Sequence, residues 1–294
     1  MIKKNISAKQ KAYHAYLIES EKSKATISKY IHDVSELVKF IGKRELSKAI
    51  IAEYKSYLTE NFKPSGVNSK LAAVNSFLEF IGRSDCKVKP LKLQKNIFSN
   101  ARKELKKSDY EKLVKYALKS GNERLALILQ TICSTGIRVS ELQYITVSAV
   151  QKNTAEINCK GKFRVIFIPK LLGKLLRQYI KKEKITAGAV FVTRNKKPIS
   201  RSQIWRMMKE ICEKSGVSPE KVFPHNLRHL FARTYYSREK DIFRLADILG
   251  HSSVNTTRIY TMESGEMHRR QLDSLNLVLQ QNIVYVASTR KKRN

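Results

Sequence analysis

Five polar residues in three separated motifs have types that could act together on a phosphodiester. They are Arg138 in TGIRVSEL, His225 and Arg228 in HNLRH, and His251 and Tyr260 in LGHSSVNTTRIY. Cleaving a phosphodiester without a metal requires a nucleophile, a positive clamp on the phosphate oxygens and a proton for the departing oxygen. A phenol can be the nucleophile, guanidinium forks match phosphate oxygens, and imidazoles can bind the phosphate or move the phenol's proton. The motifs therefore contain the parts for metal-free strand cleavage.

Each of these residues also has an ordinary structural interpretation when it is taken alone. Tyr260 is one of 13 tyrosines and stands beside Ile259, so it could simply pack in a core. Arg138 and Glu141 are three residues apart, which is a spacing that suits an ion pair. A single histidine after a helix end, such as His251, is usually structural or exposed to solvent. Only the combination favours chemistry over packing.

The two histidines of HNLRH raise the question of a metal site. His225 and His229 are four residues apart and could chelate one ion from a helix. The HExxH pattern, however, requires a glutamate directly after the first histidine, where this chain has Asn226. No Asp, Cys or third His near the motif supplies an obvious ligand set. We therefore expect no metal and no other cofactor.

The first 86 residues are predicted to form a domain of about four helices. Apolar residues recur with a helical period in residues 27–41, 46–58 and 71–81, and Gly42 and Gly82 end two of these runs. A segment around residues 13–17 adds a further helix. The pattern predicts a small helical bundle whose polar faces carry many lysines.

Residues 87–107 interrupt this pattern and are predicted to link two domains. They contain Pro90, show little periodicity and carry a strong excess of Lys and Arg. Such a strap suits the phosphate backbone of DNA, and a solvated spacer is the alternative interpretation. The candidate DNA contacts are Lys87, Lys89, Lys92, Lys95, Arg102 and Lys103.

The rest of the chain to residue 265 is predicted to form a second domain, mainly α with a small antiparallel β-sheet. SDYE at residues 108–111 has the pattern of a capping box, in which Ser108 caps a helix and Glu111 reaches back. AEINCKGKFRVIFIP has two β-rich runs around a Lys-Gly-Lys turn, which is typical of a hairpin. A short strand is expected at residues 189–193. Helices are expected in residues 123–136 and 170–184, from about residues 202, 225 and 241, and as a short segment before Tyr260.

The charge of the chain points to a polyanionic partner. Its 294 residues include 58 Lys and Arg against 25 Asp and Glu, which gives a formal net charge of +33. An excess of this size favours nucleic acid as the partner. The four cysteines form no CxxC pair, which argues against zinc modules and disulfide scaffolds and fits a reducing cytosol. Because we find no signal peptide and no long apolar run, we expect no membrane association and a cytoplasmic protein, nucleoid-associated when bound to DNA.

The three motifs together resemble those of the tyrosine recombinases, the phage integrase family. That family has the patterns TGxRxSEL, HxLRH and LGHxSxxTTxxY in the same order, and residues 108–265 are similar to its catalytic domain. Residues 1–86 look like its helical, SAM-like core-binding domain, and the compact size resembles Xer-like or small transposon-encoded members. The resemblance implies that Arg138, His225, Arg228 and His251 act around a nucleophilic Tyr260.

A lysine in the turn of the sheet is the sixth catalytic residue that the resemblance implies. The family often reads GKGxKxR there, whereas this chain reads NCKGKFR, with Cys159 in place of the glycine. Lys160, directly before Gly161, is the candidate acid that protonates the 5′-oxygen as it leaves. Lys162 is the alternative.

The resemblance further implies a site-specific DNA recombinase that serves integration, excision or resolution. Such enzymes cleave and rejoin strands through a 3′-phosphotyrosyl bond and a Holliday junction, without ATP or a divalent metal. The expected partners are double-stranded DNA with paired inverted half-sites and further copies of the chain, which form a tetramer in the synaptic complex. Residues 266–294 form a tail that either packs on its own protomer or docks on a neighbour. A type IB topoisomerase-like relaxing enzyme and a non-catalytic DNA-binding regulator are the alternatives.

Overall fold

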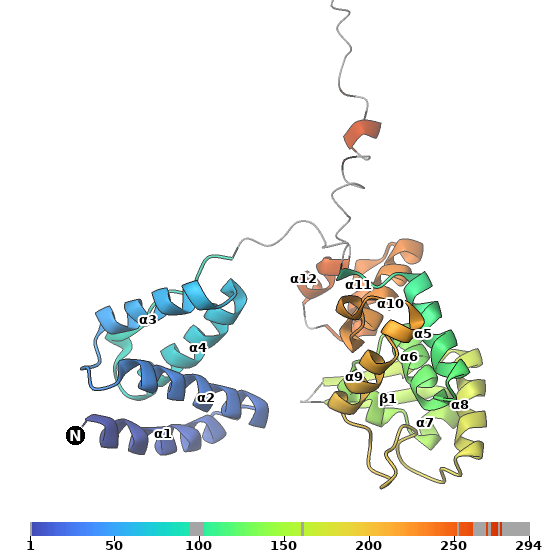
Figure 1. The fold of residues 1–294 in the computed structure, drawn as a ribbon, viewed down its shortest axis with the longest axis horizontal. Helices are drawn as coiled ribbons and strands as arrows, with labels where there is room; N and C mark the ends of the chain where they lie inside the picture. Colours follow the sequence, from blue (N-terminus) through green and yellow to red (C-terminus); the bar gives the residue numbers. More distant parts are fainter. Residues whose placement is uncertain are drawn as a thin grey trace, which may run out of the picture. The chain divides into compact units, whose positions relative to one another are not determined.

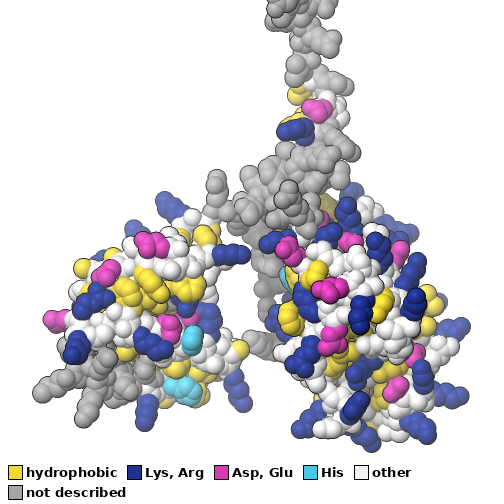
Figure 2. Space-filling view, viewed as in Figure 1, with side chains coloured by type: hydrophobic (Ala, Val, Ile, Leu, Met, Phe, Trp, Pro, Cys, Tyr) yellow, Lys and Arg dark blue, Asp and Glu magenta, His cyan; other side chains and the backbone are white. Residues whose placement is uncertain are grey.

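The chain divides into two compact units, residues 1–95 and residues 96–294. The computed structural model describes residues 2–93, 103–159, 162–251, 253–260, 269, 272–275 and 277. Both units are built mainly from helices (Figure 1). Lys and Arg side chains are spread over the visible face of each unit, among fewer acidic ones (Figure 2). Within the described ranges, no helix is both long and apolar enough to cross a membrane.

The N-terminal unit is the four-helix bundle that the apolar periodicity predicts. Its elements are α1 (Ile2–Glu19), α2 (Lys24–Ile41), α3 (Lys48–Asn61), α4 (Pro64–Phe80) and the short 3-10 helix η1 (Ser84–Cys86). Ser23 caps α2, because its hydroxyl accepts a hydrogen bond from the backbone N–H of Thr26, and Gly42 ends that helix. The inward faces bury apolar side chains such as Val34 and Leu71. Burial of these faces stabilises the bundle.

The described ends of the predicted linker pack against the two units. On one side, Val88 and Leu91 lie against the apolar core of the N-terminal unit. The side-chain amides of Asn75 and Asn68 hydrogen-bond to the backbone of these two residues. On the other side, Leu105 is buried in the core of the C-terminal unit. The stretch that connects the two units is therefore shorter than residues 87–107.

The C-terminal unit surrounds helix α6 (Glu123–Thr135) with further helices and a small sheet. Its other described elements are α5 (Lys107–Lys119), η3 (Val139–Tyr144), α7 (Val147–Lys152), β1 (Thr154–Cys159), β2 (Lys162–Phe167), α8 (Lys170–Lys182), α9 (Arg201–Glu210), η4 (Glu213–Ser215), η5 (Pro219–Lys221), α10 (Pro224–Glu239), α11 (Ile242–Leu249), α12 (Val254–Thr257) and η6 (Arg258–Tyr260). Most side chains of α6 are buried, because α5, α8, α9 and α10 pack around it. This arrangement confirms the predicted fold class, mainly α with a small antiparallel sheet.

Two local predictions for this unit are wrong. Helix α5 begins one residue before Ser108, so that serine does not cap it. The carboxylate of Asp109, rather than that of Glu111, accepts the hydrogen bond from the backbone N–H of Lys106. Residues 189–193 form only isolated β-bridges, so the sheet has two strands among the described residues.

The hairpin of β1 and β2 turns a charged side chain inward and aromatic side chains outward. Cys159 pairs with Lys162 at the closed end of the antiparallel ladder. Side chains alternate between the two faces of a strand. On β2, Phe163 and Phe167 are exposed, whereas Arg164 points inward with only 10% of its side chain exposed. The hairpin therefore delivers a buried guanidinium to the interior of the unit.

Candidate active site

Helix α6 ends at a glycine that allows the next segment to lie close to α10. Gly136 is the C-cap of α6 and has a φ of +65°, a conformation that favours glycine. A Cβ at this position would lie 2.5 Å from a ring carbon of Phe231 on α10. The chain turns at this contact, and Arg138 stands directly before η3. The helix end thus sets the position of the first predicted catalytic residue.

Arg228 is a buried guanidinium that has no carboxylate partner among the described residues. It lies on α10 and is 3% exposed. Its Nη1 donates to the carbonyl of Gly136 over 2.5 Å, and its Nη2 donates to the carbonyl of Leu249 over 2.6 Å. Burial and the nearby Arg138 lower the pKa of Arg228 to about 10, while the Tyr260 phenol acts in the opposite direction. Arg228 therefore remains charged at neutral pH.

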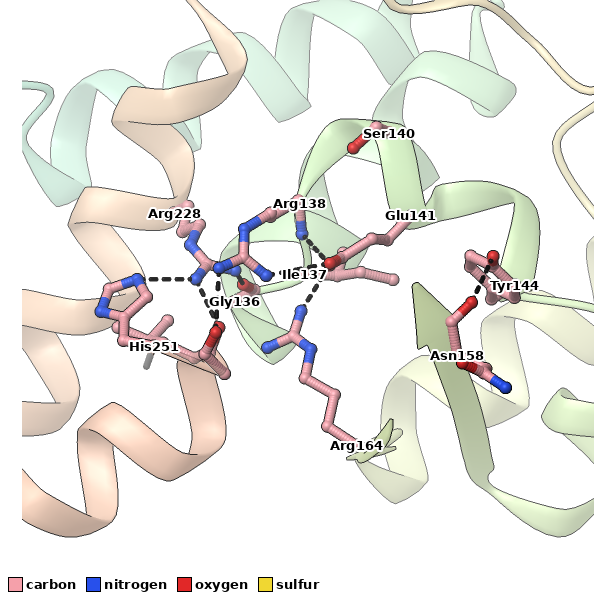
Figure 3. A network of polar contacts seen from close by, with 12 residues as sticks. Gly136, Ile137, Arg138, Ser140, Glu141, Tyr144, Asn158, Arg164, Arg228 and His251 are labelled. Atoms are coloured by element: carbon pink, nitrogen blue, oxygen red, sulfur yellow. Dashed lines mark hydrogen bonds and ion pairs between the residues drawn. The ribbon is translucent and has the colours of Figure 1, made fainter. Parts of the chain in front are cut away.

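Arg138 is held by a carboxylate and a backbone carbonyl near Arg228 (Figure 3). Its Nη1 donates to Oε1 of Glu141 over 2.9 Å, and its Nη2 donates to the carbonyl of Gly250 over 3.1 Å. Its backbone N–H also donates to Oε2 of Glu141 over 2.9 Å. The side chain is 40% exposed. The ordinary interpretation of Arg138 as an ion-pair residue is thus confirmed, and its guanidinium also remains accessible.

His251 follows the end of α11, where Gly250 forms a left-handed cap. Its Nε2 lies 3.1 Å from Nη2 of Arg228, and its Nδ1 lies 2.8 Å from the hydroxyl of Thr257. Because a guanidinium only donates hydrogen bonds, we assign Nε2 as the acceptor and place the proton on Nδ1. Burial, with the charges of Arg228 and Arg138, lowers the pKa of His251 to about 4. The ring is therefore neutral at pH 7.

Tyr260 ends the short segment of α12 and η6, next to α10 and α11 in Figure 1, and is 4% exposed. Its ring is stacked with that of His251, with centroids 6.0 Å apart, and meets the ring of His229 at 4.7 Å in an edge contact. It also packs with Leu245 and Leu249. Tyr260 therefore packs in a small apolar cluster and lies among the polar residues of the site at the same time.

His225 and His229 continue the row of rings along α10. Their ring centroids are 4.2 Å apart. Burial and then Arg228 lower the pKa of His225, and burial and then His225 lower the pKa of His229 to about 3, so both rings are neutral at pH 7. The Nε2 of His229 is buried without a hydrogen-bond partner in the part of the chain that the structure describes. The sequence placed His229 in the motif but did not predict its contact with Tyr260.

Glu141 and Arg164 support the site and were not among the predicted functional residues. The buried carboxylate of Glu141 contacts both Arg138 and Arg164 (Figure 3). Arg164 also donates from Nη1 to the carbonyl of Ile248 in α11 over 2.8 Å. Burial alone would raise the pKa of Glu141, but the backbone N–H of Arg138 and the charge of Arg164 hold it below its usual range. A buried charge needs a partner, so an arginine within a predicted strand was the sequence signal for this network, but the alternation alone did not tell that Arg164 points inward.

The predicted catalytic lysine lies outside the described residues. Lys160 precedes β2, and Lys162 is described only in its backbone. The strands on either side are anchored to the rest of the unit. Tyr144 of η3 donates a hydrogen bond to the carbonyl of Asn158 over 3.0 Å, and Arg164 joins β2 to α11. The hairpin strands are thus fixed to the segments that carry the other site residues.

The predicted DNA contacts of the linker are distributed over described and undescribed segments. Lys87 forms an ion pair with Glu79 over 2.7 Å. Lys89, Lys92 and Lys103 are exposed, whereas Lys95 and Arg102 lie outside the described residues. Their contact with DNA stays a prediction.

An open cavity of about 310 Å³ adjoins the clustered side chains. It is lined by Arg138, His225 and Arg228 and extends to Arg201 and Trp205 of α9, which the sequence reasoning missed. No Asp or Glu lines it. Among the described residues, no group of three or more His, Cys, Asp or Glu side chains could hold a metal ion. The cavity therefore has the charge to receive an anion of phosphate size.

Several tyrosine recombinases are similar to this chain. XerA of Pyrococcus furiosus is 27% identical over 273 residues, which cover 90% of this chain and 93% of the relative. XerD of Halalkalibacterium halodurans is 26% identical over 275 residues, covering 86% of this chain and 91% of the relative. XerH of Campylobacter jejuni is 34% identical over 153 residues, which cover 49% of this chain and 42% of the relative.

Solved structures of recombinases and integrases share the fold. A lambda integrase dimer bound to a COC′ core site matches with a TM-score of 0.69 and 18% identity, covering 86% of this chain and 94% of that chain. XerH recombinase bound to a palindromic difH substrate matches with a TM-score of 0.65 and 20% identity. The match covers 87% of this chain and 80% of that chain. The model of the phage integrase family matches residues 103–267, more than half of the chain. The chain therefore belongs to the phage integrase family, the tyrosine recombinases.

Proposed function

We propose that the protein is a site-specific DNA recombinase that cleaves and rejoins strands through a 3′-phosphotyrosyl intermediate and a Holliday junction. The observation that carries this proposal is the buried guanidinium of Arg228, whose described partners are two carbonyls, His251 and the phenol of Tyr260. A buried positive charge without a counter-ion is unfavourable unless an anion joins it. A phosphate in the cavity that Arg138 and Arg228 line would meet both charges. Tyr260 is linked to this cavity through Arg228 and through its ring contact with His251.

In the proposed cleavage step, the phenol oxygen of Tyr260 attacks the phosphorus of the scissile phosphate. A bond forms between that oxygen and phosphorus, the bond from phosphorus to the 5′-oxygen breaks, and the departing 5′-oxygen takes up a proton. Arg138 and Arg228 bind the non-bridging oxygens and stabilise the charge that develops on them. The phosphotyrosyl ester keeps the energy of the broken bond. Attack on it by a 5′-hydroxyl of the partner duplex therefore rejoins DNA without ATP.

The imidazoles of His225 and His251 fit proton transfer and phosphate binding. Both rings have lowered pKa values and are neutral at pH 7, so a free ring nitrogen can accept a proton from Tyr260 or donate a hydrogen bond to the phosphate. In His251 both nitrogens already contact Arg228 and Thr257, so this ring takes such a role only when it exchanges one of those contacts. The contact of His251 with Arg228, at 3.1 Å, supports a place for this ring beside the phosphate. His229 contacts the ring of Tyr260 and is a positioning residue in this proposal.

Lys160 is the proposed acid that protonates the 5′-oxygen, with Lys162 as the alternative. The assignment rests on its position directly before a glycine in the turn between β1 and β2. A substrate with sulfur in place of the bridging 5′-oxygen distinguishes the two lysines, because a thiolate leaves without protonation. We expect this substrate to restore cleavage to Lys160→Ala. Restoration of Lys162→Ala alone would move the role to that residue.

DNA with paired inverted half-sites is the proposed partner, and a tetramer is the proposed assembly. The DNA-bound lambda integrase and XerH structures support a duplex partner, as does the formal charge of +33. Residues 1–86 and 108–265 are proposed to clamp the duplex, joined by the basic linker, and the protein is proposed to act in the bacterial cytoplasm. The tail at residues 266–294 is proposed to take part in assembly. Unchanged tetramer formation on DNA after deletion of residues 270–294 would remove that role.

Trapping the covalent intermediate tests the proposed function. The probe is a nicked duplex that carries the recombination site, sought as inverted repeats flanking a short spacer beside the coding region. We expect the wild-type protein to form a covalent adduct and Tyr260→Phe to bind the same duplex without forming one. Tyr235→Phe is the matched control, because Tyr235 is partly buried against the same cluster.

Two outcomes would contradict the proposal. A wild-type protein that forms no adduct on its own site would be a DNA-binding protein without this chemistry. Robust relaxation of a supercoiled plasmid that lacks the site would indicate a type IB topoisomerase-like enzyme instead.

A further inference from the structure

A second cavity in the C-terminal unit, of about 620 Å³, is lined by basic side chains that the proposed cleavage step does not use. We call it the basic pocket. Its basic residues are Arg124 of α6, Arg194 and Lys197 of the turn before α9, and Arg206 of α9. Thr193, Asn195 and Gln203 add neutral polar groups, and no Asp or Glu lines the cavity. We propose that the basic pocket binds a backbone phosphate of the DNA duplex, remote from the phosphate that is cleaved.

The backbone around the basic pocket is fixed by its own hydrogen bonds. The N–H of Thr193 donates to the carbonyl of Lys197 over 2.8 Å, which closes the turn. Arg124 donates from Nη1 to the carbonyl of Val192 over 2.7 Å and so joins the turn to the start of α6. Arg194 and Lys197 therefore extend from a defined turn, and the basic side chains converge because of the fold.

The positive charges of the basic pocket are not compensated within the described protein. Arg194, Lys197 and Arg206 form no ion pair with any described residue. Exposed basic side chains elsewhere in this unit, such as Lys170 and Lys174, also form none with the described residues, so the basic pocket differs from them in gathering several cations around one cavity. Like charges that line one concave surface raise the local potential for anions. The chemistry of the pocket therefore selects an anion, and its guanidinium groups match the oxygens of a phosphate.

The position of the basic pocket relative to the Tyr260 site fits two phosphates of one duplex. Arg124 stands on the first turn of α6, and Arg138 follows the last turn. The helix has 13 residues, so it is about 20 Å long. A duplex rises about 3.4 Å per base pair, so the bound phosphate would lie within about six base pairs of the cleaved one. This inference rests on the proposed function, because it assumes that the duplex also occupies the Tyr260 site.

Binding to a duplex of mixed sequence, labelled with fluorescein, tests the proposal. The full-length protein carries Tyr260→Phe throughout, so that anisotropy reports binding alone. The pocket variant adds Arg194→Ala and Arg206→Ala but keeps Arg124, which holds the turn. We expect its affinity to fall roughly tenfold. The slope of log K against log[KCl] should fall in magnitude by about 0.9, the value for one phosphate.

A charge-matched control separates a specific pocket from general electrostatic attraction. Lys170→Ala with Lys174→Ala removes the same number of positive charges from exposed positions on α8. We expect this pair to change the affinity by less than about twofold. Equal losses in the two double variants, or an unchanged salt slope in the pocket variant, would overturn the proposal. Thermal unfolding of each variant verifies that it is folded.

A second measurement distinguishes a backbone phosphate from a free anion. The side-chain N–H resonances of Arg194 and Arg206 are followed by NMR while the labelled protein is titrated with the same duplex or with inorganic phosphate. We expect both resonances to shift with the duplex. A shift with inorganic phosphate alone would make the pocket a free-anion site and refute the backbone contact. Neither measurement depends on covalent chemistry, so a failure to form the Tyr260 adduct is a separate result.

Discussion

In the described residues, each unit buries one carboxylate between two cations. In the N-terminal unit, Asp33 contacts Lys29 on its own helix α2 and Lys70 on helix α4, with the latter contact at 3.2 Å. In the C-terminal unit, Glu141 lies between two arginines. Both arrangements satisfy a buried charge, which would otherwise be unfavourable. The difference lies in what the cations are able to do next.

The lysines that contact Asp33 join two helices, whereas the arginines that contact Glu141 lie at the candidate active site. A lysine presents a point charge on a flexible stem, whereas a guanidinium is a rigid fork with several donors. Glu141 and the Gly250 carbonyl take some of the donors of Arg138, and that side chain is still partly exposed. The same electrostatic motif thus stabilises packing in one unit and, in the other, orients Arg138, the proposed phosphate-binding group.

The largest expected effect is the difference in the rate of adduct formation between Arg138→Ala and Lys70→Ala. Arg138→Ala removes half of the proposed clamp, so adduct formation at saturating protein should slow by about 10²–10³-fold. Lys70→Ala should leave that rate within about twofold. It should instead lower the free energy of unfolding by about 1–3 kcal/mol, because Asp33 loses a partner. Adduct kinetics and urea unfolding measure the two effects, and similar rates for both variants would break the comparison.

Replacing the two carboxylates should give a smaller difference in the rate of adduct formation between the two units. Glu141→Gln leaves Arg138 in place but loosens it, and adduct formation should slow by roughly 10–100-fold. Asp33→Asn should change stability without changing the rate. Single-turnover assays at saturating protein isolate the chemical step from binding. A normal rate in Glu141→Gln would show that Arg138 needs no positioning.

The stability of the C-terminal unit should depend on pH because of its buried histidines. His251 and His229 have folded pKa values of about 4 and about 3, below the ordinary value of 6.5. The unfolded chain therefore binds protons first, and stability should fall as the pH drops from about 6.5 toward 4. Between pH 7 and pH 5 we expect a loss of about 1–2 kcal/mol for His251 after allowance for partial solvent access.

Thermal unfolding across this pH range measures that loss. His251→Gln should flatten the dependence, and His14→Gln on α1 should not. If both variants follow the wild-type curve, the neutral state assigned to His251 is wrong.

The smallest expected difference, about 1 kcal/mol between two glycine variants, concerns the glycine that lies against Arg164. Gly250 has a φ of +62°, and a Cβ there would lie 2.6 Å from Cδ of Arg164. Gly250→Ala should therefore lower the free energy of unfolding by about 2 kcal/mol, from backbone strain and displacement of that side chain. Gly216 has a similar φ of +66° with nothing within 4 Å, so Gly216→Ala should lower it by only about 1 kcal/mol. Urea unfolding that gives equal losses would argue against a fixed Arg164.

The sequence allowed the N-terminal bundle to be predicted because each helix buries one regular apolar stripe. It also supplied the residues of the candidate site, since the motifs of Arg138, Arg228 and Tyr260 are contiguous stretches of sequence. Their convergence in one place is a tertiary property, which local patterns do not contain. The resemblance to a family supplied that step, and the structure shows the contacts that hold the arrangement together.

The remaining features depend on competition between neighbours that a single sequence does not rank. Asp109 and Glu111 both stand at the start of α5, and only the geometry of the first turn selects the former. On β2 the alternation of side chains predicts two faces but does not tell which one points inward. Because Phe163 is more apolar than Arg164, the sequence did not indicate that the arginine is the buried residue. The packing of Tyr260 was also open, because an aromatic residue at a helix end suits both a core and a site.

The carbonyls that hold Arg228 come from the ends of two helices, and this origin has an electrostatic consequence. Gly136 caps the C-terminus of α6, and Leu249 is the last residue of α11. Helix C-termini carry partial negative charge from their aligned peptide dipoles, and they stabilise a cation without bearing a full charge. The two dipoles steady Arg228 in the DNA-free protein but do not neutralise it. An anion such as the phosphate of the proposed substrate can therefore approach Arg228 without first displacing a carboxylate from that guanidinium.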